Sequence, residues 1–238
     1  MSKIREIIDS YGYKTELHSH TMPVSNCGHV TAAETVANYL WAGCDALVIT
    51  NHLNPEKWLE GDPAVRAEEY LSDYYLAKDA ARGTELEVIL GVEIRFSENP
   101  NDYLVYGVDP AEVEKMIYYI DRGISEFYRN FKNTRNIILQ AHPFRKNMVK
   151  APLDSIDGIE TFNVHPNHNS RIAIAAKYAA ENGLFVSGGS DNHEPDTFAL
   201  CLMRSKTKPR DSFDVAEILK SKNFLFDMSG HIVFPFGY

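Results

Sequence analysis

The chain has 238 residues, of which 44% are hydrophobic and 24% are charged, and its net charge at pH 7 is −9. This composition excludes a disordered tail protein, and the negative charge argues against a protein that binds nucleic acid by neutralising phosphates. No apolar run reaches the roughly 18 residues of a membrane span, the first residues are charged, and three cysteines are scattered without a pattern. We therefore expect one domain over residues 1–238, a cytoplasmic location with reduced thiols, and no membrane partner.

Short apolar runs alternate with helical patterns along the whole sequence. The predicted strands are residues 15–17, 46–50, 86–92, 103–108, 137–141, 158–164, 184–188, 198–203 and 224–227. The predicted helices are residues 31–43, 62–83, 111–131, 171–182 and 211–221, the first with a capping box of Thr31 and Glu34. Strands that alternate with helices indicate parallel pairing through crossover units. The expected fold is therefore α/β, a distorted (β/α)7 TIM-like barrel.

Side chains that can bind a metal follow six of the predicted strands. They are His18, His20, His52, Glu93, His142, His165, His168, Asp191 and His193. In a parallel barrel, the carboxyl ends of all strands open on one face, where active sites are built. One histidine after a strand is usually an ordinary loop residue, but chance does not account for so many. Imidazoles with carboxylates suit Zn, Mn or Fe, and the lack of cysteine at these positions argues against a structural thiolate zinc site.

The motifs that contain these side chains resemble those of the polymerase and histidinol phosphatase (PHP) family of metal-dependent phosphoesterases. In chain order they are His18-Ser19-His20-Thr21, Thr50-Asn51-His52, Gly91-Val92-Glu93, His142-Pro143-Phe144-Arg145 and Gly189-Ser190-Asp191-Asn192-His193. Residues 103–107 and 159–163 also resemble segments of the family. Three positions depart from the family pattern: Glu16 and Asn51 replace aspartates, and Asp102 stands where a histidine is common.

The resemblance implies a stand-alone enzyme with two or three divalent metal ions (Zn, Mn or Fe). The implied metal ligands are His18, His20, His29, His52, Glu93, His142, His165, Asp191 and His193. Glu93 would bridge two ions, and His52 and His193 would hold a third. His29 is the candidate for a further ligand of that third ion, although it follows the His-x-His motif at a greater distance than the ligand of the family. His168 is the alternative to His165.

The chemistry of phosphate ester hydrolysis needs residues of these types. The uncatalysed reaction is extremely slow, and a pair of metal ions can generate a hydroxide at neutral pH and bind the oxygens of the transferred group. A metal-bridging hydroxide would attack, so no serine or cysteine nucleophile is required. The implied catalytic residues are Glu93, Asp191, His193 and Arg145, whose guanidinium would bind the non-bridging oxygens. His193 or a metal-bound water would protonate the leaving group.

The predicted function is hydrolysis of a small phosphorylated metabolite, most simply a phosphomonoester such as histidinol phosphate, a nucleotide or a sugar phosphate. Two alternatives stay open. One is a metal-dependent hydrolase of a C–N or lactone bond. A carboxylated lysine after a middle strand would favour that reading, but no lysine stands there, and Lys146 and Lys150 lie in a loop past His142. The other is a nucleic-acid-associated PHP module, against which the net charge counts. We expect no stable nucleic-acid complex and leave a homo-oligomer open.

Overall fold

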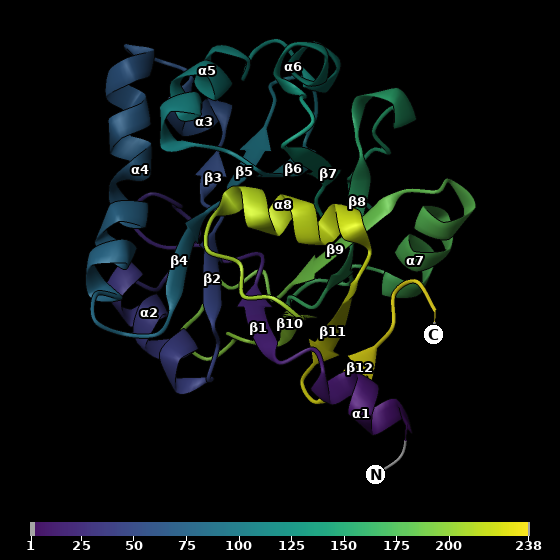
Figure 1. The fold of residues 1–238 in the computed structure, drawn as a ribbon. Helices are drawn as coiled ribbons and strands as arrows, with labels where there is room; N and C mark the ends of the chain where they lie inside the picture. The colour runs from purple at the N-terminus through teal and green to yellow at the C-terminus, as the bar shows by residue number, and fades with distance from the viewer. Residues whose placement is uncertain (1–2, 238) are drawn as a thin grey trace.

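A computed structural model describes residues 3–237, and the strands in it form two six-stranded sheets (Figure 1). The first contains β1 (Tyr13–Glu16), β2 (Ala46–Ile49), β4 (Glu87–Leu90), β10 (Cys201–Ser205), β11 (Phe224–Met228) and β12 (His231–Val233). The second contains β3 (His52–Leu53), β5 (Val92–Arg95), β6 (Asp102–Tyr106), β7 (Ile137–Gln140), β8 (Gly158–Asn163) and β9 (Phe185–Gly189). The strand orders are β12-β11-β10-β1-β2-β4 and β3-β5-β6-β7-β8-β9.

Both sheets are mixed, so the predicted all-parallel pairing is wrong, while the α/β class is confirmed. The pairs β1–β2, β2–β4, β3–β5, β7–β8 and β8–β9 are parallel. The pairs β1–β10, β10–β11, β11–β12, β5–β6 and β6–β7 are antiparallel. Residues 96–101 between β5 and β6 are too few for a parallel crossover, which needs a dozen or more residues. Within residues 3–237 the ladders do not close into a barrel.

The two sheets meet at the functional site. β2 leads directly into β3, and β4 leads into β5 through Gly91, where a Cβ atom would lie 2.8 Å from side-chain atoms of Thr50 and Val48. On the other side, an isolated parallel bridge joins Ser19 to Asn192, in the segments that follow β1 and β9. The residues after these two strands are therefore neighbours although they are distant in sequence.

Helices surround the sheets on several sides (Figure 1). They are α1 (Lys3–Asp9), α2 (Ala32–Trp41), α3 (Pro55–Trp58), α4 (Pro63–Ala80), α5 (Val113–Tyr118), α6 (Ile124–Phe131), α7 (Ile172–Glu181) and α8 (Ser212–Ser221), with 3-10 turns at Pro110–Glu112 and Leu153–Ser155. The buried apolar side chains form a cluster from Leu17 to Phe226, between the helices and the sheets. None of the helices within residues 3–237 is long and apolar enough to cross a membrane.

The helix predicted over residues 111–131 is wrong in one respect, because the chain forms two separate helices there. Gly123 between them has a φ of +81°, and a Cβ atom at this position would lie 2.3 Å from the Glu98 carboxylate. Glu98 accepts a hydrogen bond from the backbone N–H of Ile124 and so starts α6. The capping box of Thr31 and Glu34 is confirmed at the start of α2.

Candidate metal centre

Glu93, in β5, is the centre of a group of four imidazoles. Its carboxylate oxygens lie 3.3 Å from His18 Nε2, 3.2 Å from His20 Nε2, 2.9 Å from His52 Nδ1 and 3.2 Å from His142 Nε2. The Glu93 side chain is fully buried. β5 directs the Glu93 side chain toward the junction of the two sheets. The segments that follow β1, β2 and β7 bring the imidazoles to the same place. One carboxylate is therefore shared by imidazoles from three other segments of the chain.

Asp191 forms the second acidic point of the centre. Its Oδ1 lies 3.3 Å from Nε2 of both His18 and His20, and its Oδ2 accepts a hydrogen bond of 2.5 Å from Arg145. Asp191 has a φ of 53° and His142 a φ of 29°, which are left-handed values that ordinary side chains rarely adopt. Such backbone strain is typical of functional sites, where the surrounding structure enforces it.

Several atoms of this group are buried without a hydrogen-bond partner, which points to a bound cation. They include His18 Nε2, His20 Nε2 and Glu93 Oε2. Leaving a buried polar atom unsatisfied costs about 1–3 kcal/mol. Ligands of one ion at about 2.1 Å lie about 3.0–3.4 Å apart, which agrees with the distances around Glu93 and Asp191. Nitrogen and carboxylate donors in this arrangement fit a divalent ion such as zinc.

Three sets of potential ligand atoms lie within 4.8 Å of one another. They are His18 with His20 and Asp191, His20 with His52 and His193, and His52 with Glu93 and Asp102. His20 and His52 each belong to two of these sets.

Hydrogen bonds fix the imidazole tautomers so that lone pairs face the centre. The Nδ1 atom of His18 lies 2.8 Å from the Glu160 carboxylate, and that of His193 lies 2.9 Å from the Asp191 backbone oxygen. Both partners only accept, so each Nδ1 carries the proton. His20 Nδ1 lies 3.3 Å from the Ser25 hydroxyl, which donates its own proton to Asn51 and therefore accepts from His20. In all three rings the Nε2 lone pair is left for a metal.

Removing the Ser25 hydroxyl should weaken metal binding. In Ser25→Ala the His20 ring loses its tautomer-setting partner, and we expect the affinity for Zn²⁺ to fall about 10–100-fold. Competition with a chromophoric chelator would measure the change. Ser187→Ala is the matched control, because Ser187 is also buried but its hydroxyl has no hydrogen-bond partner. Equal affinities of the two variants would contradict the role given to Ser25.

Burial and charge shift the pKa values in this group in opposite directions. Burial raises the pKa of Glu93, but His52 and His18 lower it more, so the net pKa is well below the usual range. Burial lowers the pKa of His18, but Asp191, Glu160 and Glu93 together hold it well above its ordinary value. Glu93 has the same net effect on the pKa of His52. For His193, burial and the nearby charge of His20 lower the pKa to about 3. In the metal-free protein, protons on His18 and His52 therefore balance the carboxylates.

The remaining predicted residues lie in different places. His29 is turned away from the centre: its side chain is 65% exposed and its Nδ1 lies 2.8 Å from Glu194. His165 is beside the centre, 5.3 Å from the His193 ring, but its Nδ1 accepts a hydrogen bond from the backbone N–H of Asn167. The neutral His165 ring then carries its proton on Nε2, which makes that atom a donor rather than a ligand. His168 is exposed next to it, and neither belongs to the sets of described ligand atoms.

Two carboxylates that lie close to the candidate ligands were not predicted as site residues. Asp102 is buried and close to His52 and Glu93, and Arg95 binds both of its oxygens at 2.8 and 2.9 Å. Asp102 stands where a histidine is common in the PHP family, and this departure could have identified it as a site residue. Glu160, in β8, binds His18 Nδ1 and accepts from the His142 backbone N–H. The signal for Glu160 was a carboxylate within an otherwise apolar strand.

The departures at Glu16 and Asn51 act on the backbone and on Ser25 rather than on an imidazole directly. Glu16 accepts hydrogen bonds from the backbone N–H groups of His18 and Ser190, and so joins the ends of β1 and β9. Asn51 accepts from the Ser25 hydroxyl and from the Thr21 backbone N–H. Both residues position the segments that hold the ligands.

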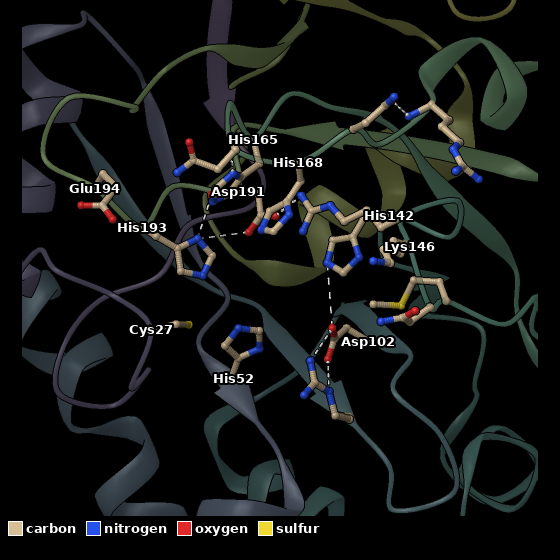
Figure 2. A pocket seen from close by; sticks show the side chains of 17 residues that line it. Cys27, His52, Asp102, His142, Lys146, His165, His168, Asp191, His193 and Glu194 are labelled. Atoms are coloured by element: carbon tan, nitrogen blue, oxygen red, sulfur yellow. Dashed lines mark hydrogen bonds and ion pairs between the residues drawn. The ribbon is translucent and has the colours of Figure 1, made fainter.

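The centre opens into a pocket of about 660 Å³ (Figure 2). The side chains around it include His52, His142, Asp102, Asp191 and His193 on the metal side. Arg145, Lys146 and Arg171 also line it, as do His165, His168 and Cys27. The pocket is large enough for a small metabolite.

No protein-family model and no curated protein matches this chain. Among solved structures, a two-domain protein from Bacteroides vulgatus, described as containing a predicted PHP-like metal-dependent phosphoesterase, has a TM-score of 0.59 at 16% identity. The match covers 90% of this chain and 64% of that protein, less than two thirds of its length. A candidate metal-dependent phosphoesterase from Bifidobacterium adolescentis has a TM-score of 0.53 at 16% identity, over 88% of this chain and 96% of its own. PsfC from Pseudomonas syringae has a TM-score of 0.56 at 15% identity, over 80% of each chain. The chain thus has a PHP-like fold, as its motifs predict.

Proposed function

We propose that this chain is a metal-dependent phosphoesterase of the PHP superfamily that hydrolyses a small phosphorylated metabolite, most simply a phosphomonoester. The observation that carries the proposal is the set of unpartnered, buried ligand atoms around Glu93 and Asp191, at the base of an open pocket. When bound there, two divalent ions supply a hydroxide at neutral pH and positive charge for the phosphoryl oxygens.

The charges around the pocket favour an anionic substrate. Arg95 and Arg145 are paired with Asp102 and Asp191, respectively. Lys146 and Arg171 also line the pocket and are exposed, and among residues 3–237 neither side chain has a carboxylate partner. Two unpaired cations at the pocket rim would attract a phosphorylated molecule and bind its charged groups.

Each residue of the centre has a distinct task in this proposal. His18, His20 and Asp191 would hold one ion, and Glu93 would connect it to a position beside His142. Arg145 keeps Asp191 in place through its Nη2 atom, which also donates to Asn163. His165, with its Nε2 proton directed away from Asn167, is a donor available to a bound phosphate or to the leaving oxygen.

Arg145→Lys should reduce both turnover and metal affinity. Arg145 reaches Asp191, Asn163 and Ser170 with its planar fork, which the single ammonium of lysine does not reproduce. We expect phosphate release to fall about 10–100-fold, as for other groups that orient a metal ligand. Steady-state kinetics together with elemental analysis would measure both effects. Unchanged kinetics would show that the hydrogen bond from Arg145 is not needed to position Asp191.

The proposed function is tested by assaying protein reconstituted separately with Zn²⁺, Mn²⁺ and Fe²⁺. A panel of phosphomonoesters and phosphodiesters is the substrate, and released phosphate or alcohol is measured. We expect turnover of at least one ester class that disappears in a His18→Ala/His20→Ala variant. In Lys146→Ala/Arg171→Ala, KM should rise while metal content stays unchanged, since these cations are outside the sets of ligand atoms.

The same assay distinguishes the alternatives. Metal-loaded protein that cleaves amides or lactones and no phosphate ester would overturn the proposal in favour of another hydrolase. Metal-loaded protein without any turnover above the double variant, but with salt-dependent binding to DNA, would favour a nucleic-acid-associated module.

A further inference from the structure

A second cavity lies between strands β8 and β9, helix α7 and the C-terminal segment. Its volume is about 470 Å³, which is within the range of cavities that take small organic molecules. Figure 1 shows the chain after β12 turning toward α7, and residues of both segments line the cavity. The apolar walls include Phe162, Ala176, Ala180, Leu184, Val186 and Phe236.

Thr161, in β8, brings a hydroxyl group without a hydrogen-bond partner to these walls. The residue is 1% exposed, so bulk water does not satisfy this hydroxyl. The register of β8 against β9 shifts between Glu160 and Phe162, and Thr161 therefore has no opposite residue in β9. A bulge commonly re-aims a side chain in this way. Because a buried hydroxyl without a partner is costly, it points to a ligand group that would satisfy it.

Lys222, the residue after α8, brings a positive charge to the same cavity. It is exposed, and among residues 3–237 its ammonium group has no carboxylate partner. Its Nζ atom lies 5.2 Å from the ring centre of Phe185 and 5.3 Å from that of Phe236. Such contacts with aromatic rings hold the ammonium group but leave its N–H donors for an anion.

The cavity is separate from the metal centre. Glu160, the residue before Thr161, lies with its carboxylate 2.8 Å from His18 Nδ1, whereas Thr161 lines the cavity. The two sites are therefore on opposite faces of β8, as the alternation of side chains along a strand requires. Among the residues that the structure describes, none lines both the cavity and the pocket of the metal centre.

We propose that this cavity binds a planar aromatic carboxylate with a hydroxyl group at its far end. The rings of Phe162 and Phe236, together with the small side chains of Ala176 and Ala180, favour a planar aromatic body. The carboxylate pairs with the Lys222 ammonium group, and the ligand hydroxyl exchanges a hydrogen bond with Thr161. No bond is made or broken, so the inference goes beyond the proposed function and does not depend on it.

The probe is a hydroxynaphthoate with its two polar groups at opposite ends, titrated calorimetrically into the full, metal-reconstituted chain. We expect a dissociation constant below about 1 mM. Thr161→Val should weaken binding of this probe about 2–10-fold and leave binding of naphthoate, which lacks the hydroxyl, unchanged. Thr15→Val is the matched control, since the Thr15 hydroxyl is also buried without a partner but lies outside the cavity.

Two further variants test the walls and the charge. Ala180→Leu should remove detectable binding by filling the space, while Ala173→Leu, at another exposed position of α7 outside the cavity, should not. Lys222→Asn should weaken binding of the carboxylate about 2–5-fold. Asparagine is chosen because it tolerates the left-handed φ of 57° at this position.

The outcomes decide between this cavity and the metal centre. The His18→Ala/His20→Ala variant should bind the probe as well as the unaltered protein does, and binding that disappears with the metal would overturn the proposal. So would the absence of binding at about 1 mM, or binding that persists in Ala180→Leu. Thermal unfolding would verify that the variants are folded. None of these results bears on phosphate ester hydrolysis, which the release of phosphate tests separately.

Discussion

Glu93→Gln is expected to remove nearly all phosphoesterase activity and most of the metal. The Glu93 carboxylate lies within 3.3 Å of His18, His20, His52 and His142, so it is the one acidic group within residues 3–237 that all four imidazoles share. Glutamine keeps the shape but loses the charge and presents N–H donors to nitrogen lone pairs. We expect metal affinity to fall more than about 100-fold and phosphate release at least about 1000-fold, equivalent to ~4 kcal/mol of transition-state stabilisation.

The activity of Glu93→Gln should be compared with that of His193→Ala. His193 belongs to only one set of ligand atoms and makes no ion pair with Glu93 within the described residues. Its removal should therefore cost less activity than Glu93→Gln. Kinetics and elemental analysis in metal-saturating buffer would measure both variants, and thermal unfolding would verify that both are folded. The reverse order of activities would contradict the bridging position of Glu93.

Metal affinity should rise steeply with pH through the neutral range. In the metal-free protein the neighbouring carboxylates hold the pKa values of His18 and His52 well above their ordinary value, despite the opposing effect of burial. Both rings therefore keep their protons above pH 6.5, and a metal ion must displace them. Each displaced proton makes the affinity for Zn²⁺ about tenfold higher per pH unit, until the pH passes the raised pKa.

Chelator competition between about pH 6 and about pH 8 would give the slope, and titration calorimetry in buffers of different ionisation enthalpy would count the protons released. His193→Ala should leave the proton count unchanged, because the pKa of His193 is lowered to about 3 and its ring is already neutral. His52→Ala should reduce the count. An affinity that does not vary with pH would mean that His18 and His52 are neutral before the metal binds.

The sequence by itself determined the local features of this protein and pointed to the candidate ligands that the structure brings together. The capping box at Thr31 and Glu34 predicts the start of α2 correctly, because a cap depends on residues within one turn. Apolar runs predict strands such as β2 and β7, which are buried along their whole length. Spaced motifs point to His18 and Asp191, which follow the ends of β1 and β9, and to Glu93, which was expected after a strand but lies within β5.

Only the tertiary structure decided how the strands pair and which side chains meet. Antiparallel pairing of β6 with β5 and β7 depends on the direction in which the chain returns, and an apolar run does not encode this direction. His29 and Cys27 differ by two positions, yet the loop turns His29 to Glu194 and leaves Cys27 at the pocket. The anchors that decide this, Ser25 to His52 and His29 to His193, join segments that are distant in sequence. Long-range hydrogen bonds of this kind have no periodic signature, so they appear only once the chain is folded.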